Sequence, residues 1–301
     1  MLSIRRSESA MFKKISPYLL IMPALLFLIV FLVYPMINTV WLSFWKYSYF
    51  EPEIKTFVGI KNYISLFKDV GFYSSLSFTV LFTLICISIE FVVGMALALV
   101  LKKVTRFGTV IRTISIFPYM VAPIAAGQIW RLLFNLDSGM VNYVLNVFSL
   151  RSVNWLGSNS GAFWAVVISQ VWKSTPFVML VLLSGLQSIP EEVYEAAVVD
   201  GASPWQSFKS ITFPLLLPSV TIALVFETIF KLRVFDLVIT LTGGGPGKAT
   251  TPLGILLQRN YFQTYEAGYS GAISVVLLFL GATFSVLYFF LINKQANRGA
   301  R

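Results

Sequence analysis

The chain has 301 residues, of which 57% are hydrophobic and only 12% are charged. A soluble domain carries roughly 25% charged residues, so this composition excludes a soluble enzyme of this size. The sequence has no histidine, which excludes metal sites and acid–base chemistry that depend on imidazole, and its one cysteine, Cys86, excludes an intrachain disulfide. The formal net charge of +10 is better explained by basic residues gathered on one side of a membrane than by a nucleic-acid partner.

Six segments are apolar over about 20 residues, the length that a helix needs to cross a ~30 Å hydrocarbon core. They lie at 17–41, 74–101, 110–133, 163–186, 213–234 and 271–292. Basic residues precede the first segment, but it runs too long for a signal peptide and lacks a small-residue cleavage site, so we expect a retained anchor. We therefore predict an all-α polytopic membrane protein with six transmembrane helices, in which a first helix at 17–41 precedes a five-helix core at 70–293.

Basic residues gather in three segments that six spans place on one side of the membrane. These are the N-terminal arm at 1–16, the connector after the second span and the tail at 294–301. The residues are Arg5, Arg6, Lys13, Lys14, Lys102, Lys103, Arg106, Arg112, Lys294, Arg298 and Arg301. The positive-inside rule assigns that side, with both termini, to the cytoplasm. The connector at 187–212 falls on the same side, yet it has one lysine and four acids.

The stretch at 187–214 carries two signals for the start of a helix. Ser188 with Glu191 and Ser203 with Gln206 each fit a capping box, and a proline follows each serine. Gly201 is a natural stop, since glycine accepts the left-handed conformation after a helix. We predict helices at about 189–200 and 204–212, with Pro214 opening the next span. On these residues alone, a knob that docks on a partner and a solvated re-entry loop both remain open.

The same stretch has a specific spacing: Glu195-Ala196-Ala197, then Gly201, then Ile211, Phe213 and Pro214. This spacing resembles the cytoplasmic loop of binding-protein-dependent ABC importers, with Phe213 in place of leucine. Three further segments resemble the carbohydrate-uptake branch: Trp130–Asn135 with Gly139 and Asn142, Asn154–Leu156, and Leu241–Gly247. The Gly-Gly-Gly-Pro element resembles the first permease of maltose- and glycerol-phosphate-type systems.

The resemblance implies a type I ABC importer permease in the bacterial cytoplasmic membrane, forming half of a heterodimeric pore for a sugar, polyol or sugar-phosphate-like solute. Its implied partners are a second permease subunit, a cytoplasmic ATPase dimer and an extracytoplasmic solute-binding protein. The chain itself would have no catalytic site and bind no cofactor, because ATP and magnesium belong to the ATPase. By residue-level correspondence, Glu195 is the acidic contact with the ATPase, Ala196 and Ala197 pack closely and Gly201 makes the bend. The full set of expected coupling residues is Glu195, Ala196, Ala197, Asp200, Gly201, Ile211 and Pro214.

Charged residues inside spans are costly and tend to mark pathways or pairs. The candidates are Glu90, Lys173, Glu227 and Lys231, of which the last two lie four apart on one helix face. They either line a path for a hydroxyl-rich solute or form a structural ion pair within the bundle.

Three rival functions remain open on the sequence. One is an ABC permease for a non-sugar solute. Another is an ion-coupled carrier in which Glu90, Lys173 and Glu227 relay protons. The third, a membrane enzyme, is disfavoured because the chain lacks histidine and a convincing nucleophile–base set.

Overall fold

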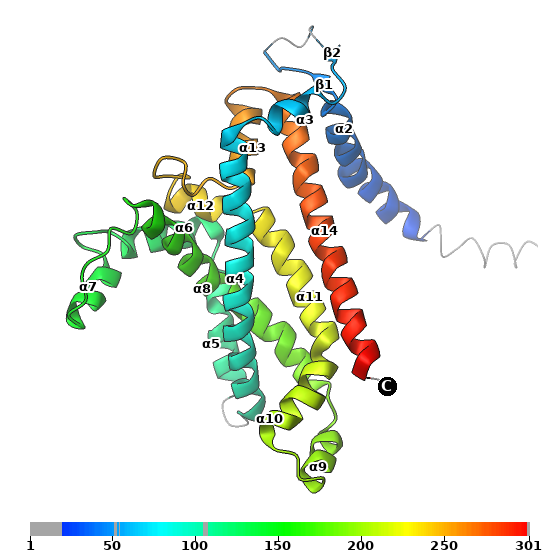
Figure 1. Cartoon of the computed structure of the whole chain (residues 1–301), viewed down its shortest axis with the longest axis vertical. Coiled ribbons are helices and arrows are strands. Elements are labelled where there is room, and N and C mark those ends of the chain that lie inside the picture. The colour runs from blue at the N-terminus through cyan, green and yellow to red at the C-terminus, as the bar shows by residue number, and fades with distance from the viewer. Residues whose placement is uncertain (1–19, 51–52, 54, 105–107, 300–301) are drawn as a thin grey trace, which may run out of the picture. The chain divides into compact units, whose positions relative to one another are not determined.

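The computed structural model describes residues 20–50, 53, 55–104 and 108–299 (Figure 1). The basic arm at 1–16, residues 17–19 of the predicted first span, Arg106 and Arg301 lie outside the described residues. The side chains of Lys294 and Arg298 lie outside them too, since only the backbone is described there. The chain forms two compact units, one comprising residues up to Leu66 with Asn260–Val275 and the other comprising Phe67–Arg259 with Val276 onward.

The first unit contains the N-terminal apolar helix and a small hairpin. The helix runs over Leu20–Leu42 and includes a π-helical turn, η1 (Ile29–Val33), followed by α2 (Tyr34–Leu42). Strands β1 (Trp45–Lys46) and β2 (Thr56–Phe57) pair antiparallel, with Trp45 opposite Phe57. The short helix α3 (Lys61–Leu66) follows, and the Asn62 amide donates to the carbonyl of Trp45 at 3.0 Å. This bond ties the helix to the hairpin.

The second unit is a helical bundle. Its helices are α4 (Val70–Lys103), α5 (Gly108–Met120), α6 (Pro123–Leu133), α7 (Met140–Val147), α8 (Asn159–Gln187), α9 (Glu191–Val199), α10 (Pro204–Ser207), η2 (Phe208–Thr212), α11 (Phe213–Leu232) and α12 (Asp236–Leu241). Two more, α13 (Leu253–Phe262) and α14 (Ala267–Gly299), belong partly to each unit. Helix α8 packs against α4, α5 and α11, and α6 packs against α12.

The packing of α4 on α8 follows from the residues at their crossing. A Cβ added at the buried Gly94 of α4 would lie 3.0 Å from Cγ1 of Val178 on α8. Small residues allow helix backbones to approach closely in a membrane, where packing rather than the hydrophobic effect drives association. Two apolar clusters result, one joining α4, α6, α8 and α12, and one joining α4, α8 and α11 at the end that carries α9.

The predicted number of six spans is confirmed when the bent helix pair α5–α6 is counted as one span. Within the described residues, five helices are long and apolar enough to cross a membrane: Leu20–Leu42, Val70–Lys103, Asn159–Gln187, Pro204–Leu232 and Ala267–Phe290. The predicted span at 110–133 consists of two helices, Val110–Met120 and Pro123–Leu133, which meet at 90°.

The bend between α5 and α6 has local causes. Ala122 is extended, with a ψ of 138°, as expected for a residue before proline, and Pro123 opens α6. The Lys173 ammonium of α8 donates to the backbone carbonyl of Tyr119, near the end of α5, at 3.1 Å. This bond satisfies a carbonyl that lies close to the break between the two helices. Pro176, in contrast, lies inside α8, which continues through it.

The segments that carried the family resemblance around α7 have a structural role. The Asn142 carboxamide oxygen accepts from the Trp155 indole and from the backbone amide of Val153, both at 3.0 Å. A Cβ added at Gly139 would lie 2.2 Å from the carbonyl oxygen of Asn135, so this turn requires glycine. These residues therefore fix the α6–α8 connection.

Candidate coupling surface and translocation site

Helix α9 ends in a glycine-dependent bend. Gly201 has a φ of +75°, a conformation that favours glycine. The amide of Ala202 donates to the Ala197 carbonyl at 2.9 Å and that of Gly201 to the Val198 carbonyl at 3.0 Å. These two bonds form a Schellman motif, which satisfies the last carbonyls of the helix. The predicted stop at Gly201 is therefore confirmed.

The two predicted capping boxes have different outcomes. The box at Ser203 is present, with the Ser203 amide donating to the Gln206 side chain at 2.8 Å. The box at Ser188 is wrong, because its hydroxyl donates to the Gly185 carbonyl at 2.8 Å and so closes the end of α8. Helix α9 begins after Pro190 without a side-chain cap.

Pro214 lies in the first turn of α11 (Phe213–Leu232), as predicted, but no loop separates α11 from the helix before it. Helix α10 passes through the π-helical turn η2 directly into α11, so the backbone is helical over Pro204–Leu232. A π turn carries one extra residue and shifts the hydrogen-bond register. Ile211 and Pro214 are half-buried in this continuous helix. Movement of α10 is therefore coupled to α11 without an intervening loop.

The surface of α9 and α10 exposes acids and apolar side chains together. Glu195, Ala196 and Asp200 are exposed, whereas Ala197 is 8% exposed, so it packs inward and does not offer the contact surface expected of it. The sequence analysis did not single out the exposed apolar residues. They are Val198, Val199 and Trp205, at 74%, 86% and 70% exposure.

Among the residues that the structure describes, the four acids of this loop have no counter-ion. Both ion pairs found in the described part of the chain lie elsewhere, in the bundle interior. The acids are Glu191, Glu192, Glu195 and Asp200. Unpaired acids beside exposed valines make a surface that is suited to a basic and apolar partner groove.

Three of the four charged residues predicted within the spans meet in the interior. The Lys231 ammonium lies 2.8 Å from Oε2 of Glu90 on α4 and also contacts Glu227, one turn earlier on α11. Glu90 and Lys231 are 0% exposed and Glu227 is 1% exposed. Of the two sequence-based alternatives, this geometry favours the structural one, an ion trio that ties α4 to α11.

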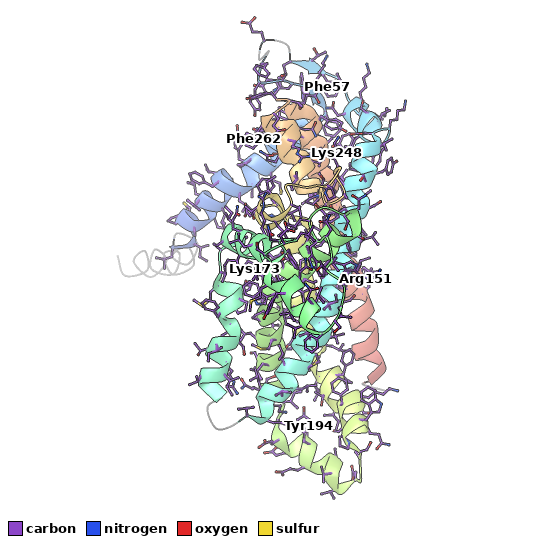
Figure 2. All side chains as sticks on the ribbon, turned by 90° about the vertical axis from the view of Figure 1, so that its left-hand side faces the viewer. Phe57, Arg151, Lys173, Tyr194, Lys248 and Phe262 are labelled. Carbon is purple, nitrogen blue, oxygen red and sulfur yellow. The ribbon has the colours of Figure 1, made fainter. Side chains whose placement is uncertain are left out.

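Lys173 is separate from this trio and lines a cavity of about 460 Å³. The cavity lies between the α5–α6 bend, the middle of α8 and the segment that joins α11 to α12. Its lining residues are Tyr119, Pro123, Gln170, Lys173, Ser174, Phe230, Arg233, Val234, Phe235, Asp236 and Leu237. Figure 2 shows Lys173 midway along the bundle.

The chemistry of this cavity combines rings with hydrogen-bonding groups. Gln170 donates to the Ser174 hydroxyl at 2.8 Å, so an amide and a hydroxyl already meet on one wall. Arg233 and Asp236 are exposed at the opposite wall. Gln170, Arg233 and Asp236 were not predicted as site residues, although a glutamine within an apolar run and charges at the end of a span are signals in the sequence.

Within the described residues, no group of three or more cysteine and carboxylate side chains has the arrangement of a metal site. The buried trio pairs its carboxylates with an ammonium instead.

Comparison with known proteins covers almost the whole chain. The model of the family described as "binding-protein-dependent transport system inner membrane component" matches residues 90–298. The trehalose/maltose transport system permease protein of Thermococcus litoralis is 42% identical over 271 residues, which are 90% of this chain and 91% of that protein. The sulfoquinovosyl glycerol transport system permease protein of Agrobacterium fabrum is 36% identical over 92% of this chain and 90% of that protein.

One solved structure shows the same fold. It is a chain of the bacterial alginate ABC transporter in complex with an alginate pentasaccharide-bound periplasmic protein, with a TM-score of 0.80 and 22% identity. The match covers 95% of this chain and 98% of that one.

Proposed function

Because the chain belongs to the family of binding-protein-dependent transport system inner membrane components, we propose that it forms half of a pore that imports a sugar or sugar-like solute at the expense of ATP. As a member of that family it is a multi-pass membrane permease subunit and not an enzyme. Two of its relatives are named for trehalose and maltose and for sulfoquinovosyl glycerol, which supports a carbohydrate solute here.

The cavity of about 460 Å³ supports this solute class. Its volume lies within the range of about 300–1,000 Å³ that small-molecule sites occupy. Tyr119, Phe230 and Phe235 supply ring faces, and Gln170 and Ser174 supply hydrogen-bonding groups for hydroxyls. Lys173, of the four expected pathway residues, is the one that lines this cavity, and we assign it to the solute path. Glu90, Glu227 and Lys231 we assign to the framework of that path.

The loop at 187–214 supports coupling to a separate ATPase. We assign the docking contact to Glu195, Ala196 and Asp200 with the neighbouring Val198 and Val199. Gly201 sets the bend, and Ile211 and Pro214 transmit movement along the continuous helix into α11. Ala197 holds α9 against the bundle from within.

The two sites are joined by rigid elements. Ser174 lies 13 residues before Gln187 on α8, which is about 20 Å at 1.5 Å per residue. Phe230 lines the cavity at the far end of α11, whose other end continues from the loop. A push on the loop therefore reaches two walls of the cavity along two helices.

The proposed assembly contains a second permease subunit, a cytoplasmic ATPase dimer that binds ATP and magnesium, and an extracytoplasmic solute-binding protein. In this assembly the basic connector after α4, the loop at 187–214 and both termini face the cytoplasm.

The exposed, unpaired acids and valines of the loop carry the proposal. Its test is affinity purification of the tagged chain from its native membrane in a mild detergent. We expect a second permease and an ATPase to co-purify with the wild type, and the Glu195→Arg variant to lose the ATPase while retaining the second permease. Recovery of the wild-type chain alone, stable and monodisperse, would contradict the proposal.

A further inference from the structure

The side chain of Tyr194, next to Glu195 in α9, contacts two other elements at once. The Lys102 ammonium lies over its ring, with Nζ 4.0 Å from the ring centroid. Its hydroxyl lies 3.2 Å from Oγ1 of Thr212 in η2. Lys102 belongs to the last turn of α4. One side chain of α9 therefore joins the end of α4 to the π turn that precedes α11, and Figure 2 shows Tyr194 at the end of the bundle.

These contacts are partly shielded from solvent. Tyr194 is half-buried and packs against the apolar cluster of α4, α8 and α11, and Thr212 is 4% exposed. Lys102 has no ion pair within the described part of the chain, so the ring of Tyr194 is the partner that the structure gives its charge. A cation–π contact strengthens as its groups are desolvated.

The connectivity of the chain makes this contact mechanically important. Helices α8 and α11 are joined directly to the loop through the backbone, so they follow it when it moves. Helix α4 has no such backbone connection; it packs against α8 and α11, and the Glu90–Lys231 pair joins it to α11. Glu90 and Lys102 are 12 residues apart, or about 18 Å along α4. Besides its packing on α8 and α11, helix α4 is thus joined to its neighbours by charged side chains at two points, one in the bundle interior and one at α9.

We propose that Tyr194 and Lys102, with Thr212, are positioning residues that carry the movement of α9 to α4. This inference rests on the coupling role proposed for the loop. Loss of the contact leaves the docking surface of α9 intact, because Glu195 and Val199 take no part in it. ATP hydrolysis then continues, but less of the movement of α9 reaches α4. Fewer solute molecules are therefore transported for each ATP hydrolysed.

The test is the ratio of solute imported to ATP hydrolysed by the complete transport complex in proteoliposomes. Lys102→Gln removes the cation, Lys102→Arg keeps one over the ring, and Tyr194→Phe keeps the ring without its hydroxyl. Lys103→Gln is the matched control, since Lys103 is the exposed neighbour of Lys102 in the same turn. Melting temperature and ATPase co-purification are measured on each complex.

We expect Lys102→Gln to lower the transport-to-ATP ratio by about threefold to tenfold, the range that a partly desolvated cation–π contact supports. Lys102→Arg restores the ratio, Lys103→Gln keeps it, and Tyr194→Phe has a smaller effect than Lys102→Gln. A wild-type ratio for Lys102→Gln in an intact complex would overturn the inference alone. A wild-type chain that binds no ATPase would overturn both this inference and the proposed function.

Discussion

At the scale of single residues, the ion trio in the bundle interior removes three charged groups from water. Lys231 pairs with Glu90 and Glu227, and none of the three is more than 1% exposed. Charged groups removed from water are tolerated when they are paired, and removal of one partner leaves an uncompensated charge. The trio therefore links α4 to α11 through the Glu90–Lys231 pair, and loss of Lys231 leaves both carboxylates without a counter-ion.

Replacement of Lys231 by methionine tests this link. Two buried carboxyl groups then face each other without a counter-ion, and breaking a buried pair in this way costs about 3–5 kcal/mol. We expect a clear fall in the melting temperature of the purified complex. Glu227→Gln leaves the Glu90–Lys231 pair in place and should have a smaller effect. Lys248→Met, at an exposed position, is the control, and a Lys231→Met complex that melts with the wild type would show that the trio is dispensable.

Gly201 provides a second prediction at this scale. Its φ of +75° disfavours any side chain, although nothing lies within 4 Å of a Cβ built there. Gly201→Val should therefore weaken coupling through backbone strain of about 1–3 kcal/mol rather than through a clash. Gly201→Asn should behave almost as the wild type, since asparagine tolerates the left-handed region. Equal transport by the valine and asparagine variants would argue against the bend.

At the scale of elements, the loop at 187–214 shows what local signals can and cannot predict. The stop at Gly201 and the cap at Ser203 depend on residues within a few positions, and both are confirmed. The cap at Ser188 was wrong because the hydroxyl had a competing acceptor at the end of α8. Pro214 lies at the start of α11 as predicted, but the π turn η2 joins that helix to α10 without a loop. Neither the competing carbonyl of Gly185 nor the π turn can be predicted from residue spacing alone.

The exposed face of α9 gives the prediction for this element. Burial of a valine side chain in a partner groove contributes about 1.5–3 kcal/mol. Val199 is 86% exposed, so Val199→Asp should weaken ATPase binding by at least about tenfold while the chain stays folded. Val199→Ile keeps the apolar surface and serves as the control. Titration of the ATPase onto detergent-purified permease measures both, and an undiminished affinity for Val199→Asp would exclude this face from the contact.

At the scale of the whole molecule, composition and hydropathy predicted the all-α membrane fold and the approximate span positions, because apolar length is a local property. The 90° bend between α5 and α6 was missed, although Pro123 marked its position. Hydropathy reports the apolar length of a segment but not a change in helix direction, so it assigned α5 and α6 to one span. The cavity likewise required the fold, since it joins Tyr119, Lys173 and Arg233 from three separate segments.

We propose that this chain imports a carbohydrate only as part of an ATP-driven complex. The direct measurement is uptake of a labelled sugar, beginning with trehalose and maltose, by proteoliposomes that contain the complete complex and its binding protein. We predict uptake that requires ATP on the ATPase side and disappears when the ATPase is omitted. Uptake by the lone chain under an ion gradient, without ATP, would contradict the account.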